Sequence, residues 1–220
     1  MEEILELFRD CSDLVVDEVS KFDKIEFGKY MGMGADGTPI KAIDDKAESK
    51  AIEYFKENCD YSILSEESGL IEGSEEGTII MDPIDGTSNA VMGIPFYGIS
   101  LAFTEGSLKD TTVGYVKNIP LDIEYWGIEG KGSYVDGKEL KPELREDWNF
   151  SVYMGKKAHS DCFRVASIPR RTRSLGSASL EICMVAEGVF DLYYLKTPHR
   201  QRSLRITDIA AATLILKEAG

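Results

Sequence analysis

The chain has 220 residues, of which 43% are hydrophobic and 29% are charged, a balance that is typical of a folded globular protein and excludes disorder along the whole chain. Its 25 basic and 39 acidic residues give a formal net charge of −14, and such a field repels polyanions and excludes nonspecific binding to nucleic acid. The N-terminus shows no secretory signal pattern, no apolar run approaches the ~20 residues that span a bilayer, and four widely spaced cysteines indicate neither a disulfide framework nor a zinc site. The sequence therefore predicts a cytoplasmic protein with no membrane or nucleic-acid partner.

The first third of the chain alternates helical and extended patterns. Apolar residues at helical spacing predict an amphipathic helix from about residue 3 to 21, and glycine, aspartate and proline predict a loop over 32–39. A second helix is expected to begin near Asp44, a residue type that suits a helix N-terminus. Residues 61–64 and 78–81 are predicted strands, and both are followed by carboxylates.

The remainder of the chain predicts more strands and two further helices. Segments 98–103, 112–116 and 123–126 are separated by turn signals and predict an antiparallel meander. The following elements are a strand over 150–154, a helix near 177–187, a strand over 189–194 and a helix from about 207 to 218. The pattern alone predicts a mixed α and β protein.

The most informative segment begins where the strand at 78–81 ends. Pro83 keeps the chain extended, so Asp82 and Asp85 can converge on one point while the carbonyl of Ile84 is free to join them. Hard divalent cations prefer oxygen ligands of this kind. Taken singly, Asp-Pro and Asp-Gly are ordinary turn dipeptides, and Asp85 would only cap a helix.

The next three residues favour a bound phosphate. Gly86, Thr87 and Ser88 offer backbone N–H groups and hydroxyls at a turn or helix start, where anions are well accommodated. The phosphate would then lie beside the cations. This arrangement points to phosphate-ester chemistry.

Three motifs together resemble one family. The string Asp82-Pro-Ile-Asp-Gly-Thr87 resembles the signature of the inositol monophosphatase family, which includes archaeal-type fructose-1,6-bisphosphatases. The segment from Leu64 to Gly69 resembles the acidic pair of that family, and Thr207 to Ala211, followed by Glu-Ala-Gly at the end, resembles a third motif. The three motifs occur in the family's order and the resemblance covers nearly the whole chain.

The resemblance implies a set of metal ligands and a catalytic group. The implied ligands are Glu66, Asp82, the Ile84 carbonyl, Asp85 and Asp208, with Asp44 as a further carboxylate. Thr87, Glu66 and Asp44 would orient the attacking water. Read singly, Glu66 would be a solvated loop acid, and Asp44 and Asp208 would be helix caps.

The implied cofactor is magnesium, two or three ions in each active site, with manganese as a substitute. Two such ions ~4 Å apart can bridge a phosphate, lower the pKa of a bound water and stabilise the leaving oxygen during in-line displacement. No covalent intermediate is needed. Phosphoryl transfer depends mainly on this positioning and charge neutralisation.

The substrate is less sharply defined by the sequence. The arginine-rich stretch 169–174 favours a phosphate-binding role about as much as a solvated surface loop, and further basic residues precede Asp208. We expect Arg173 and Arg205 to bind a distal phosphate and Ser177 and Ala178 to contact the sugar, while the reacting phosphate is expected near the substrate-binding set of Asp85, Gly86, Thr87, Ser88 and Asp208.

One departure from the family bears on selectivity. Inositol monophosphatases proper carry a glutamate after a tyrosine pair, where this chain has Leu195. This difference favours fructose 1,6-bisphosphate 1-phosphatase activity, with inositol-1-phosphatase activity as well. The alternatives are a nucleotide phosphatase acting on NADP or 3'-phosphoadenosine 5'-phosphate, and a noncatalytic metal-dependent sugar-phosphate-binding regulator.

The resemblance also implies an architecture. We expect a layered αβαβα sandwich of the α/β class, with an N-terminal half over 1–145 that carries most metal ligands and a C-terminal half over 146–220 that carries Asp208 and the basic loops. A homodimer is expected from the family. Family members continue past the final Glu-Ala-Gly and form another strand and helix. Relative to them, the C-terminal half of this chain is expected to be truncated and to lack these two elements.

Overall fold

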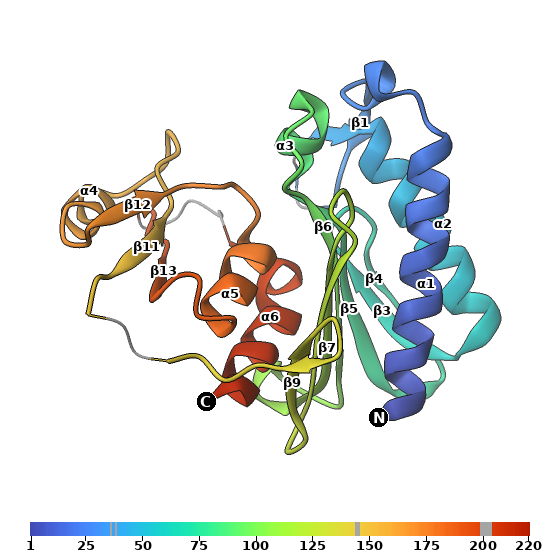
Figure 1. Ribbon diagram of the computed structural model, residues 1–220. Helices are drawn as coiled ribbons and strands as arrows, with labels where there is room; N and C mark the ends of the chain where they lie inside the picture. The colour runs from blue at the N-terminus through green and yellow to red at the C-terminus, as the bar shows by residue number, and fades with distance from the viewer. Residues whose placement is uncertain (36, 38, 144–145, 199–203) are drawn as a thin grey trace.

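The computed structural model describes residues 1–35, 37, 39–143, 146–198 and 204–220. Five layers follow one another across the molecule: helices α1 and α2, an eight-stranded sheet, helices α5 and α6, a three-stranded sheet, and helix α4 (Figure 1). Apolar clusters fill the spaces between these layers. The predicted αβαβα sandwich is confirmed.

The first layer packs two long helices on the large sheet. Helix α1 spans Glu2–Lys21, as predicted. Helix α2 spans Ala42–Asn58 and begins two residues earlier than expected, because Lys41 is the N-cap position and Asp44 caps the helix from its third residue. The rings of Phe8 and Phe55 meet edge to face at 6.2 Å between centroids, and both side chains are fully buried. Aromatic pairs of this kind add to the stabilisation from area burial.

The connection between these helices differs from the prediction. The expected loop over 32–39 includes parts of an antiparallel hairpin of β1 (Tyr30–Met33) and β2 (Pro39–Lys41). The glycine and proline residues correctly predicted a turn. They gave no sign of the two short flanking strands, which are defined by their pairing with each other. Residues 36 and 38 at the predicted loop lie outside the described residues.

The large sheet contains all of the strands predicted before residue 130. Its order is β10-β9-β8-β7-β6-β5-β3-β4, and β6 to β10 form an antiparallel meander, as expected. Strands β3 and β5 are parallel, so their carboxyl ends lie at the same edge. The bounds are β3 Tyr61–Ser65, β4 Gly69–Ile71, β5 Glu75–Asp85, β6 Gly98–Thr104, β7 Thr111–Asn118, β8 Ile123–Ile128, β9 Gly132–Val135 and β10 Lys138–Glu139.

The small sheet is built from three short parallel strands. Strand β11 (Asn149–Val152) lies between β12 (Arg171–Arg173) and β13 (Leu192–Tyr194). The predicted strand over 189–194 is therefore confined to its last three residues. Neither β12 nor helix α4 (Ser160–Ala166) was predicted, because β12 is short and polar and α4 has only seven residues.

Helices α5 (Ala178–Ala186) and α6 (Ile206–Ala219) fill the space between the two sheets and agree with the predicted helices (Figure 1). Helix α6 packs directly on β7 at Gly114. The contact is so close that a Cβ atom at position 114 would lie 2.6 Å from the carbonyl oxygen of Ala211. This backbone contact fixes the start of α6, which carries Asp208, at the edge of the large sheet.

The proposed halves meet across this middle layer. The large sheet ends at Glu139 and the small sheet begins at Asn149, yet α6 from the second half packs on the first sheet. The expected boundary at residue 145 lies outside the described residues, and the division stays a prediction. Within the described ranges, no helix combines the length and apolar character needed to cross a membrane.

Candidate active site

Three carboxylates from distant parts of the chain meet at one edge of the large sheet. Glu66 follows the last residue of β3, Asp82 lies in the parallel strand β5, and Asp208 is in the first turn of α6. One oxygen from each side chain lies within 4.8 Å of the others. The parallel pairing of β3 with β5 and the packing of α6 on the sheet bring these residues together as the motifs predicted.

Strand β5 changes its pairing with β6 between the two aspartates. Asp82 faces Ser100 and Asp85 faces Gly98, so the partner strand has one residue fewer over this interval. Such a bulge redirects side chains and releases backbone groups from the ladder. The N–H of Ile84 donates to Asp82 Oδ1 at 3.0 Å, which fixes the orientation of that carboxylate.

Asp85 joins the large sheet to the start of α5. Its Oδ2 accepts hydrogen bonds from the Ser177 hydroxyl at 2.7 Å, the Ser179 N–H at 2.7 Å and the Ser179 hydroxyl at 2.6 Å, while Oδ1 accepts from the Ala178 N–H at 3.3 Å. Ser177 and Ala178, which we expected at the sugar, therefore contact a candidate metal ligand directly.

The turn after Asp85 requires glycine. Gly86 has a φ of 96°, and a Cβ there would lie 3.1 Å from the carbonyl oxygen of Phe96. The short helix α3 (Thr87–Met92) begins at this turn, with Ser88 exposed on it.

Thr87 lies next to both Asp44 and the β5 carbonyl. Its hydroxyl donates to Asp44 Oδ1 at 2.8 Å and lies 3.2 Å from the Ile84 carbonyl oxygen. The other oxygen of Asp44 accepts the N–H of Lys41 at 3.2 Å, at the start of α2. Asp44 is thus a helix-capping residue and a hydrogen-bond partner of Thr87 at the same time.

Burial and mutual repulsion disfavour the charged forms of these acids. Burial raises the pKa of Asp44 to about 6, of Asp85 to about 6 and of Glu66 to about 8, and Arg205 opposes the rise at Glu66. The pKa of Asp82 also lies well above its usual value, through burial and the adjacent charge of Glu66. Buried, anionic, oxygen-only donors of this kind fit a hard divalent cation, which would stabilise the charged forms.

The two arginines expected at a distal phosphate lie in different places. The Arg205 guanidinium forms an ion pair with Glu66 and lies 4.0 Å from Asp208 Oδ1. Arg173 is exposed on β12, donates to the Thr172 carbonyl, and lines a separate cavity of about 380 Å³ with Arg171. The structure thus brings Arg205, and not Arg173, to the carboxylates; the basic residues His199, Arg200 and Arg202 lie outside the described residues.

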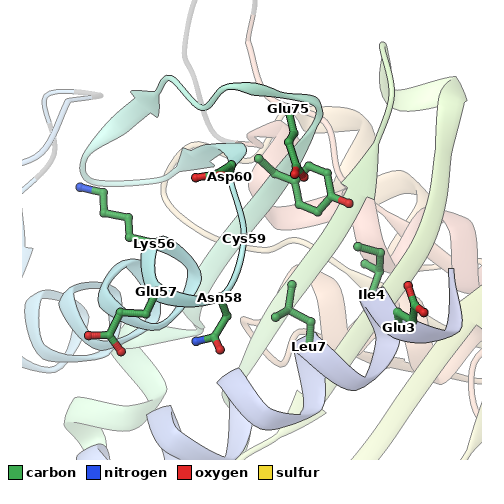
Figure 2. Close-up of a pocket in the computed structure, with 10 residues that line it drawn as sticks. Glu3, Ile4, Leu7, Lys56, Glu57, Asn58, Cys59, Asp60 and Glu75 are labelled. Carbon is green, nitrogen blue, oxygen red and sulfur yellow. The ribbon is translucent and has the colours of Figure 1, made fainter.

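A cavity of about 150 Å³ opens beside two of the acids. Asp85, Asp208 and Leu195 line this cavity. Its remaining lining residues are Tyr153, Ser174, Gly176, Ala178, Glu181, Tyr193 and Leu204. A larger cavity of about 450 Å³ lies between α1 and the end of α2 (Figure 2). Tyr61 and Glu75 in its wall begin β3 and β5, so it lies at the opposite ends of these strands from the carboxylates.

Two buried glutamates near the site, Glu48 and Glu181, were not predicted from the sequence. Glu48 accepts the Ser68 N–H at 2.9 Å and so anchors the turn that follows Glu66. Glu181 accepts the N–H groups of Leu175 at 2.9 Å and Gly176 at 3.1 Å, and it shapes the turn before α5. The spacing of Glu48 one helical turn after Asp44 was the available signal, since it places both acids on one face of α2.

Comparison with known proteins agrees with this geometry. The model of the inositol monophosphatase family matches residues 4–220. The chain belongs to the inositol monophosphatase family. Members are phosphoric monoester hydrolases that depend on divalent metal ions, and the carboxylate cluster fits that requirement.

Individual relatives carry more specific names. A fructose-1,6-bisphosphatase/inositol-1-monophosphatase of Methanothermobacter thermautotrophicus is 38% identical over 88% of this chain and 73% of its own length. A bifunctional NADP phosphatase/NAD kinase of Methanococcus maripaludis is 33% identical over 86% of this chain, which spans 37% of that protein. A solved inositol monophosphatase and fructose 1,6-bisphosphatase superposes with a TM-score of 0.85 at 28% identity, over 98% of this chain and 83% of the other.

Proposed function

We propose that this chain hydrolyses sugar or inositol phosphate monoesters with the aid of magnesium, acting on fructose 1,6-bisphosphate at the 1-phosphate and also on inositol 1-phosphate. The convergence of Glu66, Asp82 and Asp208 within 4.8 Å carries the proposal. Asp85 and Thr87 lie on the same strand end and turn as Asp82. The name of the Methanothermobacter thermautotrophicus relative supports the choice of substrate.

The ligand set proposed for the metal follows from this cluster. Glu66, Asp82, the Ile84 carbonyl, Asp85 and Asp208 would hold the ions, with Asp44 as a further carboxylate. When bound, divalent ions supply a water of lowered pKa and neutralise charge on the phosphate and leaving oxygen. The protein's part is to hold the acids in place, through the bulge at Ile84, the serines at Asp85 and the packing of α6.

Water would be oriented by Thr87 with Asp44 and Glu66. Because the Thr87 hydroxyl donates to Asp44, its lone pairs remain available to accept a hydrogen bond from the attacking water and so to orient it. Asp44 would hold the hydroxyl in this orientation. The reacting phosphate would lie against the turn at Gly86 and Ser88, where backbone N–H groups favour anions.

A phosphate-release assay tests the proposal. With saturating Mg²⁺, we expect turnover of fructose 1,6-bisphosphate and inositol 1-phosphate to exceed that of NADP and 3'-phosphoadenosine 5'-phosphate, and EDTA to abolish all of it. Hydrolysis of the nucleotides alone would overturn the substrate assignment. A folded protein that bound Mg²⁺ and sugar phosphate without releasing phosphate would be a binding regulator instead.

Nucleotide hydrolysis is the second candidate, and one observation favours it. Leu195 and Leu204 give the cavity beside Asp208 an apolar wall, and Tyr153 and Tyr193 add aromatic surface. Such a wall suits the flat face of a ring better than a fully hydroxylated cyclitol. The NADP phosphatase relative supports the same reading.

A homodimer stays a prediction from the family.

A further inference from the structure

The guanidinium of Arg205 competes with any cation for the carboxylate cluster. Arg205 is the residue before α6, and its side chain bonds to Glu66 Oε1 and lies 4.0 Å from Asp208 Oδ1. Both acids belong to the group of three whose oxygens lie within 4.8 Å. The side chains of Arg205 and Glu66 are only 30% and 16% exposed, so water screens this charge incompletely.

We infer that Arg205 is an internal counter-cation that weakens the binding of a divalent ion to this cluster and is displaced from Glu66 when the ion binds. The inference rests on the proposed metal site. It adds a second role for this end of α6: Asp208 is a proposed ligand, and the residue before the helix would set how tightly the ion is held.

Two effects of Arg205 oppose each other, and the structure indicates which dominates. Ordering the acids would raise the affinity for the ion, whereas a fixed positive charge close to the same oxygens lowers it. Asp208 Oδ2 accepts the backbone N–H of Arg205 at 2.9 Å, and Asp208 Oδ1 accepts the Thr207 hydroxyl at 3.2 Å. The first of these bonds remains in any side-chain variant of Arg205 except proline. Glu66 is also held through its turn by the bond between Glu48 and Ser68. None of these hydrogen bonds uses the Arg205 side chain, so we expect its charge to dominate its effect on ion affinity.

Metal binding in the absence of substrate tests this role. By calorimetry with Mg²⁺ or Mn²⁺ at low salt, Arg205→Gln should bind the ion about tenfold or more tightly than the wild type, because one positive charge beside a dication is removed. Arg205→Lys keeps the charge and should stay near the wild-type affinity. Arg170→Gln is the matched control, since Arg170 pairs with Asp147 on the surface, and it should change nothing.

A wild-type measurement covers the case in which the glutamine variant does not fold. In a ¹⁵N spectrum, the Nε–H resonance of Arg205 should shift as Mg²⁺ is added, while that of Arg170 should not. An unchanged Arg205 resonance at saturating Mg²⁺, or equal or weaker ion binding by Arg205→Gln, would overturn the inference. If the wild type binds Mg²⁺ and releases phosphate in either case, the proposed function stands; if it binds no divalent ion, both fail.

Discussion

Asp85 and Ser179 stand 94 positions apart in the sequence, yet both the hydroxyl and the N–H of Ser179 donate to the same oxygen of Asp85. This pair connects the end of a central strand in one sheet to the helix that separates the two sheets. This candidate metal ligand is thus also a link between the two proposed halves. Its substitution should separate catalytic from structural effects.

Asp85→Asn should lower phosphate release by more than about a hundredfold, since even residues that only support a metal ligand contribute about 10-fold to 100-fold. The amide retains one acceptor oxygen, so the protein should remain folded by circular dichroism. Asp191→Asn is a matched control, because Asp191 also accepts a backbone N–H, from Asn149 at 2.7 Å, away from the cluster. Full activity in Asp85→Asn would remove Asp85 from the site.

Thr87→Val should reduce kcat by about 100-fold or more, because it removes the hydroxyl that bonds to Asp44 while keeping the side-chain shape. Thr87→Ser keeps the hydroxyl and should retain most of the activity. Steady-state kinetics with saturating Mg²⁺ would measure both variants. A valine variant as active as the serine variant would show that this hydroxyl does not orient water.

Glu48→Ala should weaken Mg²⁺ binding by about 10-fold to 100-fold, although Glu48 is not among the proposed ligands. The substitution leaves the Ser68 N–H without its acceptor and loosens the turn that follows Glu66, at an expected cost of about 1–3 kcal/mol in stability. Glu48→Gln keeps an acceptor oxygen and should rescue both effects. Calorimetric titration with Mg²⁺ and thermal unfolding would compare the two; equal losses would point to the charge of Glu48 instead.

Stability without metal should fall as pH rises. The folded-state pKa values of about 6 for Asp44 and Asp85 and about 8 for Glu66 lie above the values near 4 expected in the unfolded chain. The folded protein therefore binds more protons between about pH 4 and pH 8, and its free energy of unfolding decreases across that window. Mg²⁺ should reverse the loss and release protons as it binds.

Urea unfolding at pH 5 and pH 8 would measure this linkage, once with EDTA and once with saturating Mg²⁺. Calorimetry in buffers with different ionisation enthalpies would count the protons released. A protein in EDTA that became more stable from pH 5 to pH 8 would contradict the raised pKa values of the cluster.

Much of the fold was predictable because its signals are local. The amphipathic stripe of α1 and the turn-separated strands of the meander can be read from residue spacing alone. Strand β12 could not be, because Arg171–Arg173 is extended only through its pairing with β11. The short hairpin of β1 and β2 depends on mutual pairing in the same way.

The site was predictable where a residue belongs to a motif and not where its role depends on a distant partner. Glu66, Asp82 and Asp208 meet as the three motifs implied. The hydrogen bonds from Ser177 to Asp85 and from Ser68 to Glu48 cross long stretches of sequence, and no local pattern encodes them. Arg173 and Ser174 are neighbours in the same basic stretch, yet they line different cavities.

Gly114 has a consequence beyond the packing of α6. At Gly114 the backbone of α6 contacts the backbone of β7 with no side chain between them. This close approach sets the distance between the sheet and the helix that carries Asp208. A single methyl group at position 114 would push α6 away from the sheet. We expect this displacement to lengthen the distance between Asp208 and Asp82 and so to weaken the proposed metal site, although residue 114 belongs to none of its proposed ligands.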